Sequence, residues 1–343
     1  MDEFALIRLL NGSRGAIFPP EAGVRVGIGD DAAVVAPSAG SELVVSVDTM
    51  VENVHFSRVT MRWADVGYKA MASSLSDLAA MGARPRWALV ALSAPKGCPV
   101  DSLSKLYEGL YACAGKYGAA VIGGDTTSSL GGMVVTVTVI GEADAGKSLL
   151  RSGARAGDAV FVTGPLGGSA AGLHYLLKRG MDAEQEEAAG GIPERLAPLA
   201  AAHRRPEPRI AAGRLLAGSG LCGALNDVSD GLASEAWEIA EASGAVLVLE
   251  EQAIPVSEQV RAYAAEVGID PLEWALFGGE DYELTGTVPK EHAGEMAALF
   301  QAHGLPFQIV GQVAERGSAP DVLLRKPGGE LVPVVKRGYN HFS

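Results

Sequence analysis

Carboxylates recur in this sequence beside glycine, serine and other small residues. Six stretches carry them: Gly27-Ile28-Gly29-Asp30-Asp31, Ser46-Val47-Asp48-Thr49, Ser76-Asp77-Leu78, Gly123-Gly124-Asp125-Thr126-Thr127, Asn226-Asp227-Val228-Ser229-Asp230-Gly231 and Gly278-Gly279-Glu280-Asp281. Each alone fits a turn or a helix cap at least as well as a ligand site, since such stretches are common at turns and strand ends. Together, many aspartates without a His or Cys cluster indicate Mg²⁺ beside a nucleotide, since magnesium prefers hard oxygen ligands and joins carboxylates to phosphates.

Two of these aspartates are predicted to lie where water is scarce. Asp48 is expected to end a strand made mostly of Val and Leu, at the edge of a dry core. Asp77 lies late in a predicted helix of small apolar residues, and the nearest basic residues, Lys69 and Arg84, are about two helical turns away. An unpaired buried carboxylate is strongly unfavourable, and a bound cation would explain both positions.

A formal match to a phosphate-binding loop occurs at residues 141–148, Gly-Glu-Ala-Asp-Ala-Gly-Lys-Ser. Such a loop needs a long helix directly after it, so that backbone N–H groups and the helix dipole face the phosphate. Arg-Ser-Gly at residues 151–153 breaks any helix there, and Glu142 and Asp144 would place negative charge in the cradle. We interpret the segment as a hairpin end that leads into an interdomain connection at residues 143–157.

Composition and charge limit the possible functions. A chain of 343 residues suits two domains. Its net charge of −13 argues against a nucleic-acid partner, which requires clustered Lys and Arg. The longest apolar runs are shorter than the roughly 20 residues that cross a bilayer, and the acidic N-terminus does not resemble a signal peptide. Three cysteines without a CxxC pair fit a reducing cytoplasm and predict no zinc or disulfide framework.

The elements that must position the carboxylates alternate between strands and helices, so the sequence predicts the α/β (α+β) class. Strands are predicted at residues 43–48, 87–93, 119–122, 133–140, 159–163, 223–228, 245–249, 283–288 and 307–313. Helices are predicted at residues 64–81, 101–117, 232–242 and 293–302. The acidic segment 181–193 is interpreted as a surface helix or mobile loop rather than a site. Four histidines are predicted to lie on surface segments without a role: His174, His203, His292 and His303.

Read in order, the motifs resemble thiamine-monophosphate kinase, a family of the aminoimidazole-ribonucleotide synthetase and selenophosphate synthetase superfamily. They are Gly-Ile-Gly-Asp-Asp-Ala-Ala, Val-Asp-Thr-Met with His55 after it, Leu-Ser-Asp-Leu-Ala-Ala-Met-Gly-Ala, Gly-Gly-Asp-Thr-Thr, Arg-Ser-Gly-Ala, Asp-Val-Ser-Asp-Gly-Leu, Gly-Gly-Glu-Asp-Tyr-Glu-Leu and Gly-Tyr-Asn-His-Phe. The resemblance extends over residues 4–342. It implies a cytoplasmic homodimer that phosphorylates thiamine monophosphate with ATP and Mg²⁺, the last step of thiamine diphosphate biosynthesis, by direct transfer.

The resemblance also implies a two-domain, synthetase-like fold and individual roles. Residues 1–145 would form an ATP- and Mg-binding domain whose sheet builds a barrel in the dimer, and residues 146–343 an α/β domain that completes the active site. The implied magnesium ligands are Asp30, Ser46, Val47, Asp48, Asp77, Asp125, Asp227 and Asp230. The implied ATP contacts are Tyr107, Gly124, Asp125, Arg151 and Ser229. The implied substrate contacts are His55, Glu280 and Tyr339. No general base is assigned.

Plainer interpretations remain open for several of these positions. Val47 stands where the family often has threonine, so only its backbone carbonyl could reach a metal. Tyr107 could be an ordinary core aromatic, Arg151 could pair with an acidic neighbour, and His55 could be a partly buried structural histidine. Asp31 is interpreted as a turn residue.

Other functions remain alternatives to the kinase. Selenophosphate synthetases carry a reactive Cys or selenocysteine in an N-terminal glycine-rich segment, whereas the first cysteine here is Cys98. Aminoimidazole-ribonucleotide synthetase would differ in its substrate. A non-catalytic accessory protein that binds Mg-nucleotide is disfavoured by the second implied pocket around His55, Glu280 and Tyr339.

Overall fold

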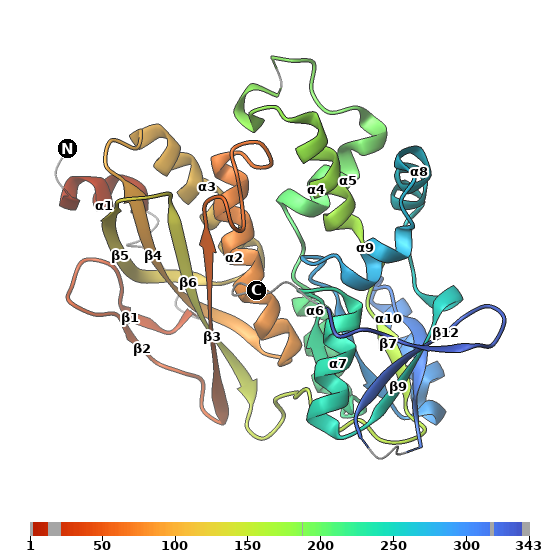
Figure 1. Cartoon of the computed structure of the whole chain (residues 1–343). Coiled ribbons are helices and arrows are strands. Elements are labelled where there is room, and N and C mark those ends of the chain that lie inside the picture. Colours follow the sequence, from red (N-terminus) through yellow and green to blue (C-terminus); the bar gives the residue numbers. More distant parts are fainter. Residues whose placement is uncertain (1–2, 13–21, 187, 316–318, 338–343) are drawn as a thin grey trace. The chain divides into compact units, whose positions relative to one another are not determined.

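The computed structural model describes residues 3–12, 22–186, 188–315 and 319–337 (Figure 1). The chain forms two compact units. The first consists of Met1–Leu78, Ala83–Gly146 and Leu176–Gly191, and the second of Ala79–Gly82, Lys147–Tyr175 and Ile192–Ser343. The boundary at residue 176 falls within α4 (Gly168–Arg179), so the segment after this helix belongs to the first unit.

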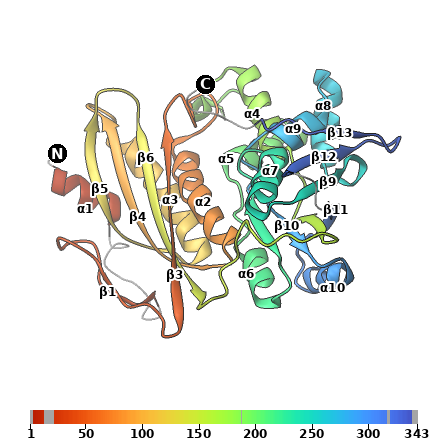
Figure 2. The same ribbon diagram turned by 60° about the horizontal axis from the view of Figure 1, so that its bottom comes forward.

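A four-stranded sheet with the order β3-β6-β4-β5 forms the centre of the first unit. Its strands are β3 (Ser41–Val51), β4 (Arg84–Pro95), β5 (Ala120–Ser129) and β6 (Val134–Asp144). β6 is antiparallel to β3 and β4, and β5 is parallel to β4. Helices α2 (Trp63–Ala80) and α3 (Val100–Tyr117) lie on one face of this sheet (Figures 1 and 2). The unit also contains α1 (Glu3–Asn11), β1 (Val24–Val26) and β2 (Val34–Val35).

Buried and exposed residues alternate along the strands, so one face of this sheet is buried and the other is open. On β6, Val135, Val137 and Val139 are fully buried, and the residues between them are partly exposed. On β3, Leu43, Val45 and Val47 are 49%, 60% and 58% exposed. A strand packed against helices on one side only produces this period of two residues. The open face therefore carries an apolar row along β3.

Two glycines allow α2 and α3 to pack closely. A Cβ atom on Gly67 of α2 would lie 1.8 Å from the carbonyl oxygen of Leu106 in α3. A Cβ atom on Gly109 of α3 would lie 1.8 Å from the carbonyl oxygen of Ala64 in α2. Because any side chain at either point would collide with backbone, the two glycines permit the close approach of α2 and α3.

A seven-stranded sheet with the order β13-β12-β9-β11-β7-β10-β8 forms the second unit. Its strands are β7 (Ala159–Val162), β8 (Ala224–Asp227), β9 (Val246–Glu250), β10 (Leu284–Val288), β11 (Gln308–Ala314), β12 (Asp321–Arg325) and β13 (Leu331–Pro333). Only the β9–β12 pair is parallel among the described strands of this sheet. The helices besides α4 are α5 (Ala197–Arg204), α6 (Ile210–Ser219), α7 (Leu232–Ser243), α8 (Glu258–Val267), α9 (Pro271–Phe277) and α10 (Ala293–Ala302).

Two apolar clusters hold these elements together. The larger joins the sheet to α7, with Val162 and Leu247 on the strands against Leu232 and Ile239 on the helix (Figure 2). The smaller joins α4, α5, α8 and α9 around Trp274. Among the described residues, no helix combines the length and the apolar character needed to span a membrane.

The predicted strands and helices are found in the structure, with two differences that bear on function. Asp48 does not end its strand, because β3 continues to Val51 in its ladder with β6. Gly124 and Asp125 lie within β5 instead of a turn, because the pairing with β4 extends to Ser129. Asp77 lies within helix α2. The expectation of turns or strand ends was therefore wrong for Asp48 and Asp125, whereas the prediction of a helix around Asp77 is confirmed.

The rejection of a phosphate-binding loop at residues 141–148 is confirmed. Residues 141–144 continue β6, and they pair with β3 as ordinary antiparallel strand. The next helix along the described chain is α4, which begins at Gly168. Within the described chain, the segment therefore leads into no helix N-terminus that could hold a phosphate.

Candidate active site

Two carboxylates and two hydroxyls meet between β3 and α2 in the first unit. Ser46 and Asp48 are two residues apart on a strand, so they face the same side. Ser73 and Asp77 are four residues apart on α2, so they also share one face. The Ser46 hydroxyl donates to Asp77 Oδ2, and the Ser73 hydroxyl forms a hydrogen bond with Asp48. Three of the predicted magnesium ligands, Ser46, Asp48 and Asp77, are thus brought together.

The electrostatics of this cluster favour a cation. Burial raises the pKa of Asp48 from 3.8 to about 6, the charge of Asp77 adds to that rise, and the Ser73 hydrogen bond opposes it. Two close carboxylates disfavour each other's ionisation, and a divalent cation between them removes the repulsion. Carboxylate and hydroxyl oxygens are also the donors that magnesium prefers. The residues of this cluster therefore fit a magnesium ion.

The cluster is not a complete metal cage. In the part of the chain that the structure describes, no group of three or more His, Cys, Asp or Glu side chains is placed to hold a metal. Asp30 lies in an exposed turn, where its Oδ1 accepts the Asp31 N–H at 2.8 Å. Asp125 is exposed on β5, and its Oδ1 accepts the Thr126 N–H at 2.9 Å. Val47 directs its side chain to the open face of the sheet, away from Asp48.

Tyr107 of α3 and Gly124 of β5 both have close contacts that fix them: Tyr107 with β5, and Gly124 with β4. Tyr107 is 5% exposed and forms a side-chain hydrogen bond with Thr126 of β5, while burial raises its pKa to about 12. A Cβ atom on Gly124 would lie 1.8 Å from the carbonyl oxygen of Val90 in β4. Glycine is therefore required at this position by the strand pairing itself, whatever else it contacts.

His55 is fixed by a turn between β3 and α2. Its Nδ1 accepts the Val51 N–H at 3.0 Å, so in the neutral ring the proton lies on Nε2. The adjacent Phe56 is buried and packs edge-to-face on Trp63, with ring centroids 6.5 Å apart. His55 itself is partly exposed.

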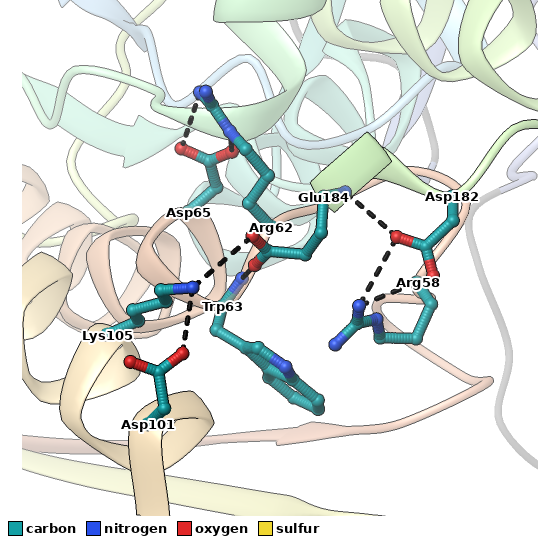
Figure 3. A network of polar contacts seen from close by, with 8 residues as sticks. All are labelled: Arg58, Arg62, Trp63, Asp65, Asp101, Lys105, Asp182 and Glu184. Atoms are coloured by element: carbon teal, nitrogen blue, oxygen red, sulfur yellow. Dashed lines mark hydrogen bonds and ion pairs between the residues drawn. The ribbon is translucent and has the colours of Figure 1, made fainter. Parts of the chain in front are cut away.

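The acidic segment after α4 holds the start of α2 (Figure 3). Glu184, in the 3-10 helix Ala183–Gln185, accepts the Trp63 N–H at 3.0 Å and so caps α2. Asp182 pairs with Arg58 at 3.2 Å, and the Arg58 guanidinium lies 4.7 Å from the Trp63 ring centroid. The segment that we interpreted as a surface helix or mobile loop thus has a structural contact with the helix that carries Asp77.

In the second unit, two predicted motifs run side by side. β8 ends at Asp227, and the next residues pair with the loop before β10. The Glu280 N–H donates to the Ser229 carbonyl at 2.7 Å, and the Tyr282 N–H donates to the Val228 carbonyl at 2.8 Å. Glu280 and Tyr282 have φ values of 67° and 51°, which side-chain-bearing residues adopt only under local strain. A predicted nucleotide contact, Ser229, therefore lies beside a predicted substrate contact, Glu280.

A polar network behind this turn includes residues that the sequence analysis did not single out. Arg151 Nε donates to Asn226 Oδ1 at 3.0 Å, and Asn226 Nδ2 donates to Glu235 and Glu238 of α7. Glu235 Oε1 accepts the Asp230 N–H at 2.9 Å. Burial raises the pKa of Glu235 to about 9, and the charge of Asp227 contributes to the rise. Arg151 does pair with an acidic neighbour, Glu238, at 3.1 Å.

His203 was predicted to lie on the surface, and this was wrong. It is 1% exposed, because Leu199, Ala200 and His203 form the inward face of α5. Its Nδ1 lies 3.4 Å from Glu280 Oε2 and 3.3 Å from Ser169 Oγ. His203 therefore supports the side chain of a predicted substrate contact.

The neighbouring residue anchors the backbone of the same loop. Asp281 accepts the Gly167 N–H at 2.6 Å and the Ser169 N–H at 3.1 Å, at the start of α4. Burial raises the pKa of Asp281 to about 7, although these N–H donors oppose the rise. Tyr339, the third predicted substrate contact, lies outside the described residues.

Known proteins match the chain along its length. The AIR synthase related protein N-terminal domain matches residues 29–143, and the C-terminal domain of the same family matches residues 155–321. A thiamine-monophosphate kinase of Bacillus subtilis is 42% identical over 346 aligned positions that cover 100% of both chains. This chain belongs to the thiamine-monophosphate kinase family.

Two solved structures of the family show the same fold. The thiamine-monophosphate kinase of Stenotrophomonas maltophilia has a TM-score of 0.82 and 34% identity, covering 97% of this chain and 98% of that one. A structure described as AaThiL complexed with AMPPCP and TMP has a TM-score of 0.76 and 31% identity, covering 99% and 97%. The Asp48–Asp77 cluster lies within the match to the family's N-terminal domain, and the Ser229–Glu280 contact lies within the match to its C-terminal domain.

Proposed function

We propose that this protein is a kinase that transfers the γ-phosphoryl group of ATP to thiamine monophosphate, giving thiamine diphosphate and ADP. The observation that carries the proposal is the full-length match to thiamine-monophosphate kinases, 42% identical in Bacillus subtilis. The solved relative that holds AMPPCP and TMP together supports the pairing of a nucleotide with this acceptor. The chain itself supports it by placing Ser229 and Glu280 in direct backbone contact.

In the proposed mechanism, carboxylate and hydroxyl side chains of this protein hold magnesium ions beside the phosphate groups of the substrates. Asp48 and Asp77, with the Ser46 hydroxyl, would hold one magnesium ion, and Asp227 and Asp230 would hold another. Bound magnesium would neutralise phosphate charge and orient the γ-phosphoryl group. Since the acceptor phosphate is already ionised near neutral pH, transfer needs no general base from the protein.

The remaining predicted contacts would orient the two substrates. The half-exposed guanidinium of Arg151 suits phosphate oxygens, and the neutral Tyr107 hydroxyl and the strand around Gly124 would contact the nucleotide. The negative charge of Glu280 would suit the positively charged thiazolium ring, and His55 and Tyr339 are the other proposed substrate contacts. Residues 1–145 would thus supply most ATP and magnesium contacts, and residues 146–343 would complete the site.

A homodimer built through the first unit is part of the proposal. The open face of its sheet carries Leu43, Val45 and Val47, each about half exposed or more. Pairing of two such faces would cover this apolar row, in keeping with the barrel that the family resemblance implies. Sedimentation or light scattering should give the mass of two chains, and a monomer at assay concentration would remove the dimer from the proposal.

The function is tested by incubating purified protein with Mg²⁺, ATP and thiamine monophosphate, and separating the products by chromatography. We expect thiamine diphosphate and ADP in equal amounts. Tight ATP binding without product would favour an accessory protein, and product from unphosphorylated thiamine would indicate a different kinase.

A further inference from the structure

The buried amide of Asn226 lies at the centre of the network behind the Ser229 turn. Asn226 is in β8 and is 1% exposed. Its Oδ1 accepts a hydrogen bond from Arg151 Nε at 3.0 Å. Its Nδ2 donates to Glu235 Oε2 and, at 2.9 Å, to Glu238 Oε2. The carbonyl oxygen and both donor hydrogens of the amide are therefore in use.

The hydrogen-bond partners of this amide connect it to two predicted nucleotide contacts, Arg151 and Ser229. On one side, the Arg151 side chain is 55% exposed, so its orientation depends on its bonds to Asn226 and to Glu238 at 3.1 Å. On the other side, Glu235 Oε1 accepts the Asp230 N–H at 2.9 Å and the Ser229 hydroxyl at 3.4 Å. Asn226 thus links an exposed cation to the turn after β8.

We infer that Asn226 is a positioning residue that holds the Arg151 guanidinium and the Ser229–Asp230 turn in one arrangement for the phosphate groups of a nucleoside triphosphate. The inference rests on the proposed function, which takes Arg151 and Ser229 as nucleotide contacts. Asn226 is too deeply buried to touch the nucleotide, so it acts through Arg151 and Glu235.

The chemistry of the three partners requires an amide at this position. Arg151 can only donate, so its partner must offer an acceptor. The two glutamates offer oxygens that the Asn226 hydrogens reach. A carboxylate at position 226 would still accept from Arg151, but it would have no hydrogen for either glutamate and would add negative charge beside Glu238. An apolar side chain would leave buried polar groups without hydrogen bonds.

The first test is Asn226→Asp, which keeps the shape of the side chain. Binding of AMPPCP with Mg²⁺ is measured by calorimetry, and the KM values for ATP and thiamine monophosphate are measured separately. We expect AMPPCP affinity to fall by about tenfold and the KM for ATP to rise, because the hydrogen bonds from the amide to Glu235 and Glu238 are lost. The KM for thiamine monophosphate should change by less than about twofold, whereas general loosening of the fold would raise both KM values.

The second test exchanges the donor and the acceptor within one hydrogen bond. Glu235→Gln alone places an amide against the amide of Asn226, and we expect it also to weaken AMPPCP binding. In the double variant Asn226→Asp with Glu235→Gln, the new amide on α7 donates to the new carboxylate on β8, while the oxygen of that amide still accepts the Asp230 N–H. We expect the double variant to bind AMPPCP more tightly than Asn226→Asp alone, a non-additive result that identifies a direct contact.

A matched control uses Glu241→Gln on the same helix, since Glu241 pairs at the surface with Lys336. Combined with Asn226→Asp, this change should not restore binding. Unchanged AMPPCP affinity in Asn226→Asp would overturn the inference. If that variant does not fold, unchanged affinity in Glu235→Gln would overturn it equally. A wild-type protein that binds AMPPCP but does not phosphorylate thiamine monophosphate would instead contradict the proposed function and leave the positioning role of Asn226 intact.

Discussion

Replacing Asp48 with asparagine should separate stability from activity. In the metal-free protein, Asp48 is largely removed from water and lies near the charge of Asp77, and its pKa rises from 3.8 to about 6. That rise corresponds to about 3 kcal/mol of free energy that opposes folding when the carboxylate is ionised. The asparagine side chain carries no charge and keeps nearly the same shape. We therefore expect Asp48→Asn to be more stable than the wild type without metal, and to lose turnover by orders of magnitude.

The sign of the pH dependence follows from the direction of the shift. Because the folded-state pKa of Asp48 lies above its unfolded value, the folded protein binds more protons between pH 3.8 and 6. Stability of the wild type therefore falls as pH rises through this window. The advantage of Asp48→Asn should be about 3 kcal/mol at pH 8, and it should shrink to about 1 kcal/mol near pH 4.5.

The assay is urea denaturation with a chelator at both pH values, followed by the same measurement with Mg²⁺. Added magnesium should stabilise the wild type more than the variant, since a ligand that binds only the folded state adds stability. Asp31→Asn, in an exposed turn, is the matched control and should not change either result. If the variant is less stable than the wild type without metal, the buried charge of Asp48 does not oppose folding; if it retains normal turnover, Asp48 is not a magnesium ligand.

Three further substitutions test other parts of the structure. Glu184→Ala removes the acceptor for the Trp63 N–H, and it should lower the free energy of unfolding, measured by urea denaturation, by about 1 kcal/mol. An unchanged free energy of unfolding would show that this cap does not stabilise α2. His203→Leu removes the ring beside Glu280 and should raise the KM for thiamine monophosphate more than the KM for ATP; an equal rise of both would argue against a role at the acceptor. Gly124→Ala brings a Cβ atom to 1.8 Å from the Val90 carbonyl and should abolish soluble folded protein, as judged by gel filtration and circular dichroism; a folded variant would show that β4 and β5 can separate there.

The sequence singled out Asp48 and Asp77 because the signal of each is local. Both acids stand among apolar residues in a readable strand and a readable helix, so a bound cation could be expected near each, and the family resemblance implied that they serve the same site. The extent of β5 was missed, since its pairing with β4 carries Gly124 and Asp125 into the ladder against the turn preference of their sequence. Propensity at these positions yields to long-range strand pairing.

The supporting residues could not be predicted because their partners are distant in sequence. Asn226 meets Arg151 across 75 positions, and Glu184 meets Trp63 across 121. His203 is buried only because α5 turns one face toward Glu280. A polar residue next to a motif gives no sign of such contacts when read along the chain, since Asn, Glu and His are also common on protein surfaces.

Direct transfer of the γ-phosphoryl group to thiamine monophosphate is tested by a single-turnover reaction with ATP that carries radioactive phosphorus in that group. Protein in excess over labelled ATP is mixed with Mg²⁺ and thiamine monophosphate, and quenched samples are separated into nucleotide, protein and thiamine fractions. We expect the label to pass directly into thiamine diphosphate, in amounts equal to the ADP formed. Label that accumulates on the protein, or that appears as inorganic phosphate while thiamine monophosphate is unchanged, would contradict this expectation.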